Sequence, residues 1–111
     1  MQVQVNTGHG IENKESLERW AAQYLDDALG HFRQDITRVE VQLSDENNGG
    51  KGAADKRCAL EARLTFHQPL AVTHHAENQD LALRGAALKL QHLLEHTLGK
   101  LESRRGRDTI R

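Results

Sequence analysis

The stretch ITRVEVQLSD, residues 36–45, decides the fold. From Arg38 to Leu43, polar and apolar side chains alternate without interruption. Alternation with a period of two is typical of a β-strand that buries one face. The side predicted to face inward consists of Val39, Val41 and Leu43, and the side predicted to face outward consists of Arg38, Glu40 and Gln42.

Three further stretches repeat this alternation. QVQVN, residues 2–6, predicts a first strand, and LAVTHH, residues 70–75, predicts a short last strand with Pro69 at its start. RCALEARLTFH, residues 57–67, predicts a third strand, whose inward residues are Cys58, Leu60, Ala62, Leu64 and Phe66. The glycine-rich and polar residues 46–56 predict a loop before it.

Two stretches show helical spacing instead. Between Asn13 and Phe32 the apolar residues recur at steps of three and four, with Asn13 as the predicted N-cap and Gly30 loosening the last turn. This stripe consists of Leu17, Trp20, Ala21, Tyr24, Leu25, Ala28 and Phe32. A last helix is predicted from about Asp80 to about Arg104, with the core stripe Leu83, Ala87, Leu90, Leu94, Leu98 and Leu101.

The element order β-α-β-β-β-α predicts an α+β fold, a four-stranded mixed sheet with both helices packed on one face. The first two strands are joined through a helix and should therefore run parallel, whereas the later strands should be antiparallel.

Length and composition restrict the class of protein. The 111 residues suit a single domain, and the charged fraction of 28% is ordinary for a globular protein. Cys58 is the only cysteine, so a reducing compartment is expected. No apolar run is long enough for a membrane span. We therefore expect a cytoplasmic protein that is a monomer when free.

Charge is unevenly distributed along the chain. The net charge is −1, yet residues 100–111 hold five Lys/Arg against two Asp/Glu. On a helical wheel, the outer face of the last helix carries a mildly basic ridge that suits phosphate contact. We therefore predict RNA contact through this ridge, its basic extension and one arginine on the outer side of the third strand. These residues are Lys89, His92, His96, Lys100, Arg104, Arg105, Arg107 and Arg63.

His92, Glu95 and His96 also fit the H-x-x-E-H pattern of inverted zinc proteases. Both histidines lie on the side of the helix away from its leucines, and no motif supplies a third ligand, so we predict no catalytic zinc site. A small metal-binding protein using this pair and another histidine remains an alternative hypothesis. We see no nucleophile with a base and no paired carboxylates with a pocket, and we predict neither an enzyme nor a cofactor or small-molecule substrate.

The chain resembles the family of ribosome hibernation-promoting factor and ribosome-associated inhibitor A. The resemblance lies in the element order and in MQVQVNTGHGIE at the start, LGHF at the end of the first helix and ITRVEVQLSDEN in the second strand. It continues through DKRCALEARLTFHQPLAVTHHAENQDLAL and KLQHLLEHTLGKLESRR. It implies a domain over residues 1–105, followed by a basic tail over 106–111, that binds rRNA of the small ribosomal subunit and inhibits translation under stress, as hibernation factors do.

The first helix departs from the pattern of that family, whose members expose many basic residues on both helices. Here Glu18, Asp26 and Asp27 occupy the outer positions, and only Arg19 is clearly basic. Phosphate contacts dominate affinity for RNA, so this departure bears on ribosome binding more than on the fold. The alternative hypothesis is a diverged domain of the same fold that binds a protein and acts as a regulatory module.

Overall fold

The computed structural model describes residues 1–8, 11–46 and 55–109, with side chains as far as Gly99. Its elements follow the predicted order, with one additional 3₁₀ turn, η1, after the first helix. They are β1 (Gln2–Thr7), α1 (Lys14–Ala28), η1 (Gly30–Phe32), β2 (Ile36–Asp45), β3 (Lys56–Leu64), β4 (Leu70–Ala76) and α2 (Gln79–Thr109).

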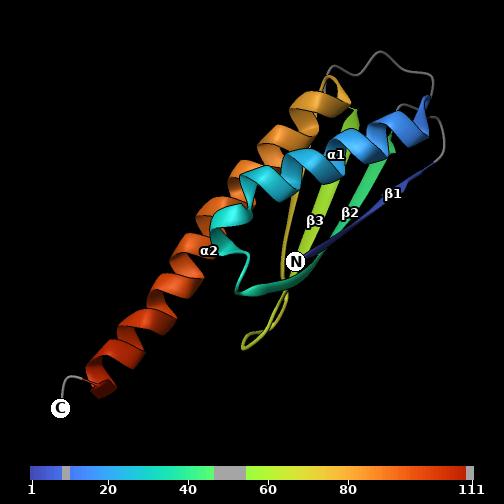
Figure 1. Ribbon diagram of the computed structural model, residues 1–111. Helices are drawn as coiled ribbons and strands as arrows, with labels where there is room; N and C mark the ends of the chain where they lie inside the picture. Colours follow the sequence, from blue (N-terminus) through green and yellow to red (C-terminus); the bar gives the residue numbers. More distant parts are fainter. Residues whose placement is uncertain (9–10, 47–54, 110–111) are drawn as a thin grey trace.

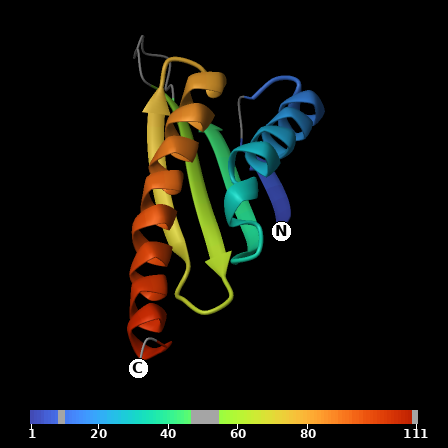
Figure 2. The same ribbon diagram turned by 60° about the vertical axis from the view of Figure 1, so that its left-hand side comes forward.

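The four strands form one sheet in the order β1-β2-β3-β4. β1 pairs with β2 in parallel, and the β2–β3 and β3–β4 pairs are antiparallel. Both helices lie on the same face of the sheet, with α1 over the β1 side and α2 over β3 and β4 (Figure 1 and Figure 2). The predicted fold class and strand directions are therefore confirmed.

The core lies between the sheet and the two helices. The register places Val41 opposite Leu60 and Leu43 opposite Cys58, so that the inward residues of neighbouring strands share one layer. The ladder shifts between Ile36 and Arg38, which allows Ile36 and Val39 both to be buried although they are three residues apart. The buried residues of the helices are Ala21, Leu25, Ala82, Leu83, Ala86, Ala87, Leu90 and Leu94.

The first helix is shorter than predicted. α1 ends at Ala28, Leu29 leaves the helical conformation, and the chain continues into η1, where Phe32 is buried. The helix begins where expected, but Asn13 adopts a positive φ of 54° and its side chain does not cap the helix. Its backbone carbonyl instead accepts a hydrogen bond from the Leu17 amide.

The prediction that Phe66 faces inward is wrong. β3 ends at Leu64, and the Phe66 side chain is 78% exposed. β4 pairs only as far as Leu70, which stands opposite Ala62, so the intervening chain has to turn. The Thr65 amide donates to the Asp35 carbonyl at the start of this bend.

The last helix extends beyond the sheet. Among the side chains described as far as Gly99, Leu94 is the last buried residue of this helix and Leu98 is partly buried, whereas the predicted core residue Leu101 lies outside the described side chains. The backbone remains helical as far as Thr109, five residues beyond the predicted end. The C-terminal half of α2 therefore protrudes past β3 and β4, as both ribbon views show (Figure 1 and Figure 2). We call Gln79–Leu98 the packed half of α2 and Gly99–Thr109 the protruding half.

Candidate nucleic-acid interface

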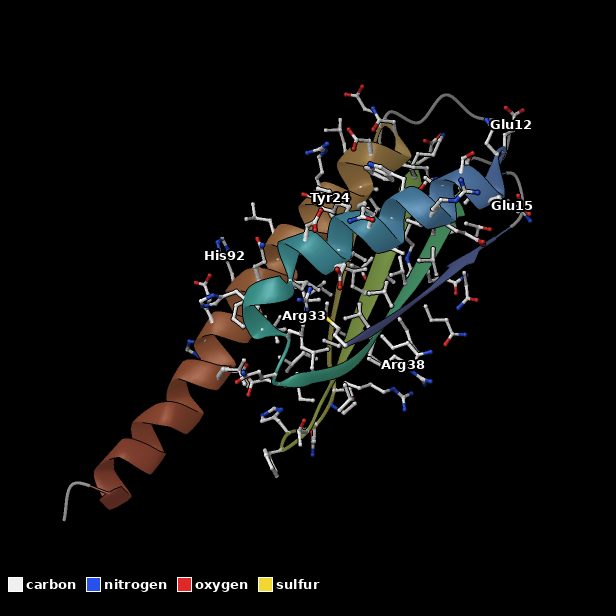
Figure 3. The ribbon with its side chains drawn as sticks, in the orientation of Figure 1. Glu12, Glu15, Tyr24, Arg33, Arg38 and His92 are labelled. Atoms are coloured by element: carbon white, nitrogen blue, oxygen red, sulfur yellow. The ribbon has the colours of Figure 1, made fainter. Side chains whose placement is uncertain are left out.

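The outer face of the packed half of α2 carries three of the predicted RNA-contact residues. Lys89, His92 and His96 are all exposed, and His92 projects away from the sheet (Figure 3). Lys89 leans towards β4, where its Nζ donates a 2.8 Å hydrogen bond to the Thr73 carbonyl. The histidines thus point into solvent, whereas the lysine is partly engaged by the backbone.

The protruding half holds the rest of the predicted ridge. Lys100, Arg104, Arg105 and Arg107 occupy helical positions between Gly99 and Thr109, and their side chains lie outside the described part of the structure. A Cβ atom built at Gly99 would meet nothing within 4 Å. This basic segment therefore begins next to a helical position with open space around it.

The outer surface of α1 is acidic, as predicted, except that Glu18 is partly buried and accepts a 3.1 Å hydrogen bond from Thr7 Oγ1 of β1. Glu15 and Asp27 are exposed, and the Arg33 guanidinium lies 3.2 Å from the Asp26 carboxylate. Figure 3 shows Glu12 and Glu15 together at the beginning of this helix. Arg19 is exposed and forms no ion pair with any described residue, so it adds positive charge to a largely negative face.

The open face of the sheet contains Arg63, which the structure separates from the other predicted contact residues. Its Nε lies 3.0 Å from Glu40 and 3.3 Å from Glu61, and Glu40 is also paired with Arg38 at 3.0 Å. The helices cover the opposite face, so Arg63 and the α2 ridge do not form one surface. Figure 3 shows Arg38 on the side of the sheet away from His92.

Carboxylates hold two of the other described cations, Lys56 and Arg84. Lys56 lies within 3.3 Å of Asp45 and Asp55, and a hydrogen bond to Asp55 raises the pKa of Lys56. Arg84 Nε donates to Asp80 at 2.7 Å, which raises the pKa of that guanidinium. Such exposed pairs add little stability, but they reduce the charge that remains for a phosphate.

Sequence analysis did not single out Arg57. It stands opposite His75 on the open face of the sheet and forms no ion pair with the residues that the structure describes. The alternation that begins at Cys58 could have identified Arg57 as a candidate contact residue, because it places Arg57 on the outer side of the strand.

The described histidines and acidic residues do not assemble a metal site. Within residues 1–8, 11–46 and 55–99, no three His, Cys, Asp or Glu side chains are placed to hold one ion. His74 faces Gly85 of α2, whereas its neighbour His75 lies on the other face of the sheet, 2.7 Å from Glu46. His92 and His96 therefore remain an exposed pair one turn apart, with no third ligand in this part of the chain.

Two further properties bear on function. Cys58 is buried, and burial raises the pKa of its thiol to about 12, against the opposing effect of the Arg57 charge. The thiol is therefore unsuited to act as a nucleophile. None of the described helices combines the length and the apolar character that a membrane crossing requires.

A family model described as sigma 54 modulation protein / S30EA ribosomal protein matches residues 4–102, which include most of β1 and α2 and all of the other helix and strands. The chain belongs to this family. The family resemblance predicted from the sequence is confirmed.

Solved structures add support for the fold. A ribosomal subunit interface protein from Coxiella burnetii superimposes on this member of the S30EA family with a TM-score of 0.65. The two sequences are 16% identical, and the match covers 89% of this chain and 99% of the other. At this identity the likeness shows a shared fold. No curated protein matches the sequence.

Proposed function

We propose that this protein binds rRNA of the small ribosomal subunit and inhibits translation as a cytoplasmic hibernation factor under stress. Membership of the S30EA family supports association with the ribosome. The proposal includes neither catalysis nor a cofactor. Residues 1–105 would form the binding domain, with the basic residues 106–111 extending it.

One observation carries this proposal, the concentration of positive charge at the C-terminal end of α2. In the described part of the chain, Arg33, Arg38, Lys56, Arg63 and Arg84 all lie within ion-pair distance of a carboxylate. The protruding half of α2, by contrast, brings four Lys/Arg against two Asp/Glu on one helical segment. Phosphate binding releases counterions only where a cation is available to replace them. The protruding half is therefore the part of the chain best suited to a polyanion.

The outer face of the packed half would continue this surface. His92 and His96 are exposed on the helix that leads into the protruding half, and Lys89 lies one turn before His92. An imidazole ring can donate a hydrogen bond to a phosphate oxygen, so these two side chains would add to phosphate contact. Arg63 would contribute only through a second contact on the open face of the sheet.

The test is binding to purified small ribosomal subunits across a range of salt concentrations. A triple variant, Lys100→Gln/Arg104→Gln/Arg105→Gln, removes three positive charges from the protruding half of α2. We expect its affinity to fall at least about tenfold, and the slope of log K against log salt to become shallower by roughly 0.7–0.9 for each phosphate that the variant no longer neutralises. Translation in a cell-free extract should recover in parallel.

A matched control keeps the same change in net charge. Lys14→Gln/Arg19→Gln/Arg33→Gln removes three exposed cations at α1 and η1 and should retain most of the affinity. If both triple variants bind like wild type with the same salt slope, the proposed surface is wrong. If wild type does not bind the small subunit even at low salt, the proposed function is wrong.

A further inference from the structure

A pocket of about 490 Å³ lies at the opposite end of the molecule from the protruding half. It forms where α1 and α2 begin, β2 ends and β3 starts. Trp20 and Leu17 supply an apolar wall, and Glu12, Asp45 and Lys56 supply its charged groups. Gln79 completes the wall and is fixed by a 3.2 Å hydrogen bond from its Nε2 to the Ser44 carbonyl.

The charges of this pocket favour a cation. Its one ammonium group, on Lys56, is already held by Asp45 at 3.3 Å and by Asp55 at 2.9 Å. Glu12 is exposed and has no ion-pair partner among the described residues. With two carboxylates against one committed ammonium, the wall is net negative and would repel a phosphate.

The neighbouring turn of α1 shows how this fold accommodates a guanidinium group. Trp20 and Tyr24 lie one turn apart, with ring centroids separated by 5.8 Å. Arg84 places its Cζ 5.1 Å from the centroid of the Tyr24 ring, while its Nε donates to Asp80 at 2.7 Å. An aromatic face and a carboxylate together hold this one arginine side chain of α2.

Around Trp20 an aromatic face and carboxylates are again present, but no described arginine lies against the ring. The Trp20 ring lines a pocket that contains carboxylates, and no described cation lies over it. Tryptophan offers the strongest aromatic face for a cation, and arginine adds planar stacking and a fork of donors that match a carboxylate.

We propose that this pocket binds an arginine side chain from a basic segment of a partner protein. Glu12 and Asp45 would accept its N–H groups while the guanidinium stacks on Trp20. A lysine would lack the planar guanidinium that stacks on Trp20. A nucleotide would bring its phosphate towards the carboxylates, which repel it. The site is distinct from the proposed RNA contact, so one molecule could hold RNA at one end and a basic protein at the other.

Trp20 makes the pocket directly measurable, since it is the only tryptophan of the chain. Its fluorescence is followed while N-acetyl-arginine amide is added to the whole protein at constant ionic strength. We expect a saturable change with an affinity in the millimolar range, because a single side chain supplies the contacts. N-acetyl-citrulline amide, a neutral probe of nearly the same shape, should give no saturation over the same range.

Two single substitutions locate the effect. Glu12→Gln should weaken binding of the arginine probe about two- to fivefold. Glu15→Gln removes the same charge from a neighbouring exposed position outside the pocket and should leave the affinity unchanged. Circular dichroism checks that both variants keep their helices.

Several results would overturn the proposal. They are the absence of saturation with arginine, an equal response to citrulline, a stronger response to guanosine than to arginine, and equal weakening in the two variants. The assay contains no ribosome, so its failure leaves the proposed function standing. Conversely, Glu12→Gln should bind small ribosomal subunits with the salt slope of wild type.

Discussion

The two halves of α2 belong to one continuous helix but meet different physical demands. The packed half lies over β3 and β4, and its side chains must fit a space that is already filled: Leu83, Leu90 and Leu94 are all fully buried. The protruding half has no sheet beneath it, and charge is the main property that its sequence supplies. Volume therefore constrains the first half and charge the second, so stability and RNA binding should respond to different substitutions.

The largest expected effect on stability lies in the packed half. Leu90→Ala leaves a cavity beneath α2 and should lower the free energy of unfolding by about 2–5 kcal/mol. Leu98→Ala makes the same change at the last position that the described side chains place against the core, where the side chain is only partly buried, and should cost clearly less. Urea unfolding at neutral pH measures both values, and equal costs would contradict the boundary drawn between the halves.

A second expected effect comes from Cys58, which stands opposite His74 in the sheet beneath the packed half. The thiol has an ordinary pKa of 9.0 in the unfolded chain, and burial raises it to about 12 in the folded protein. Above pH 9 the unfolded chain loses this proton while the folded protein keeps it. The contribution to stability is therefore complete below pH 9 and falls by about 1.4 kcal/mol for each pH unit above it, until the folded thiol also ionises near pH 12.

The measurement compares wild type with Cys58→Ala by urea unfolding at pH 8 and again above pH 9. Other groups titrate in this window, so the informative quantity is the difference between the two proteins. The advantage of wild type over the variant should shrink as the pH rises. A constant difference would show that the thiol ionises alike in both states.

The smallest expected effect uses the same substitution in each half of α2. A Cβ atom at Gly85 would overlap the ring of His74, so Gly85→Ala forces the helix or the ring to shift and should cost about 1 kcal/mol or more. Gly99 has open space around it, and Gly99→Ala should stabilise the helix by about 0.5–1 kcal/mol. Thermal unfolding followed by circular dichroism should show shifts of opposite sign. Shifts of the same sign would mean that the packing of α2 does not change at this boundary.

The fold could be predicted from the sequence because alternation and helical spacing report burial locally. β2 was predicted at its observed bounds, Ile36–Asp45, since strands flank it on both sides and its inner face is covered throughout. Alternation does not report where a partner strand ends, and for that reason Phe66 was placed inside. The turn at Leu29 was also missed, because apolar spacing continues through it to Phe32.

The candidate site was less predictable, because charge along a sequence does not show which charges are paired across the sheet. Arg63 was predicted as an RNA contact from its outward position, which does not show that Glu40 and Glu61 lie beside it. The hydrogen bond from Lys89 to the Thr73 carbonyl likewise joins α2 to β4. The spacing of residues within either element does not show which residues of the two elements meet. The pocket beside Trp20 is formed by residues from four elements, and the sequence pattern of no single element predicts it.

That hydrogen bond from Lys89 has a consequence for solubility. β4 has a neighbouring strand on only one side, and the free edge of a sheet can pair with another chain and start aggregation. The Lys89 ammonium occupies a backbone carbonyl of this strand and brings a positive charge to it. A residue predicted for RNA contact thus also protects the edge of the sheet. A variant that lacks the Lys89 ammonium should aggregate more readily than wild type at the concentrations that storage and crystallisation require.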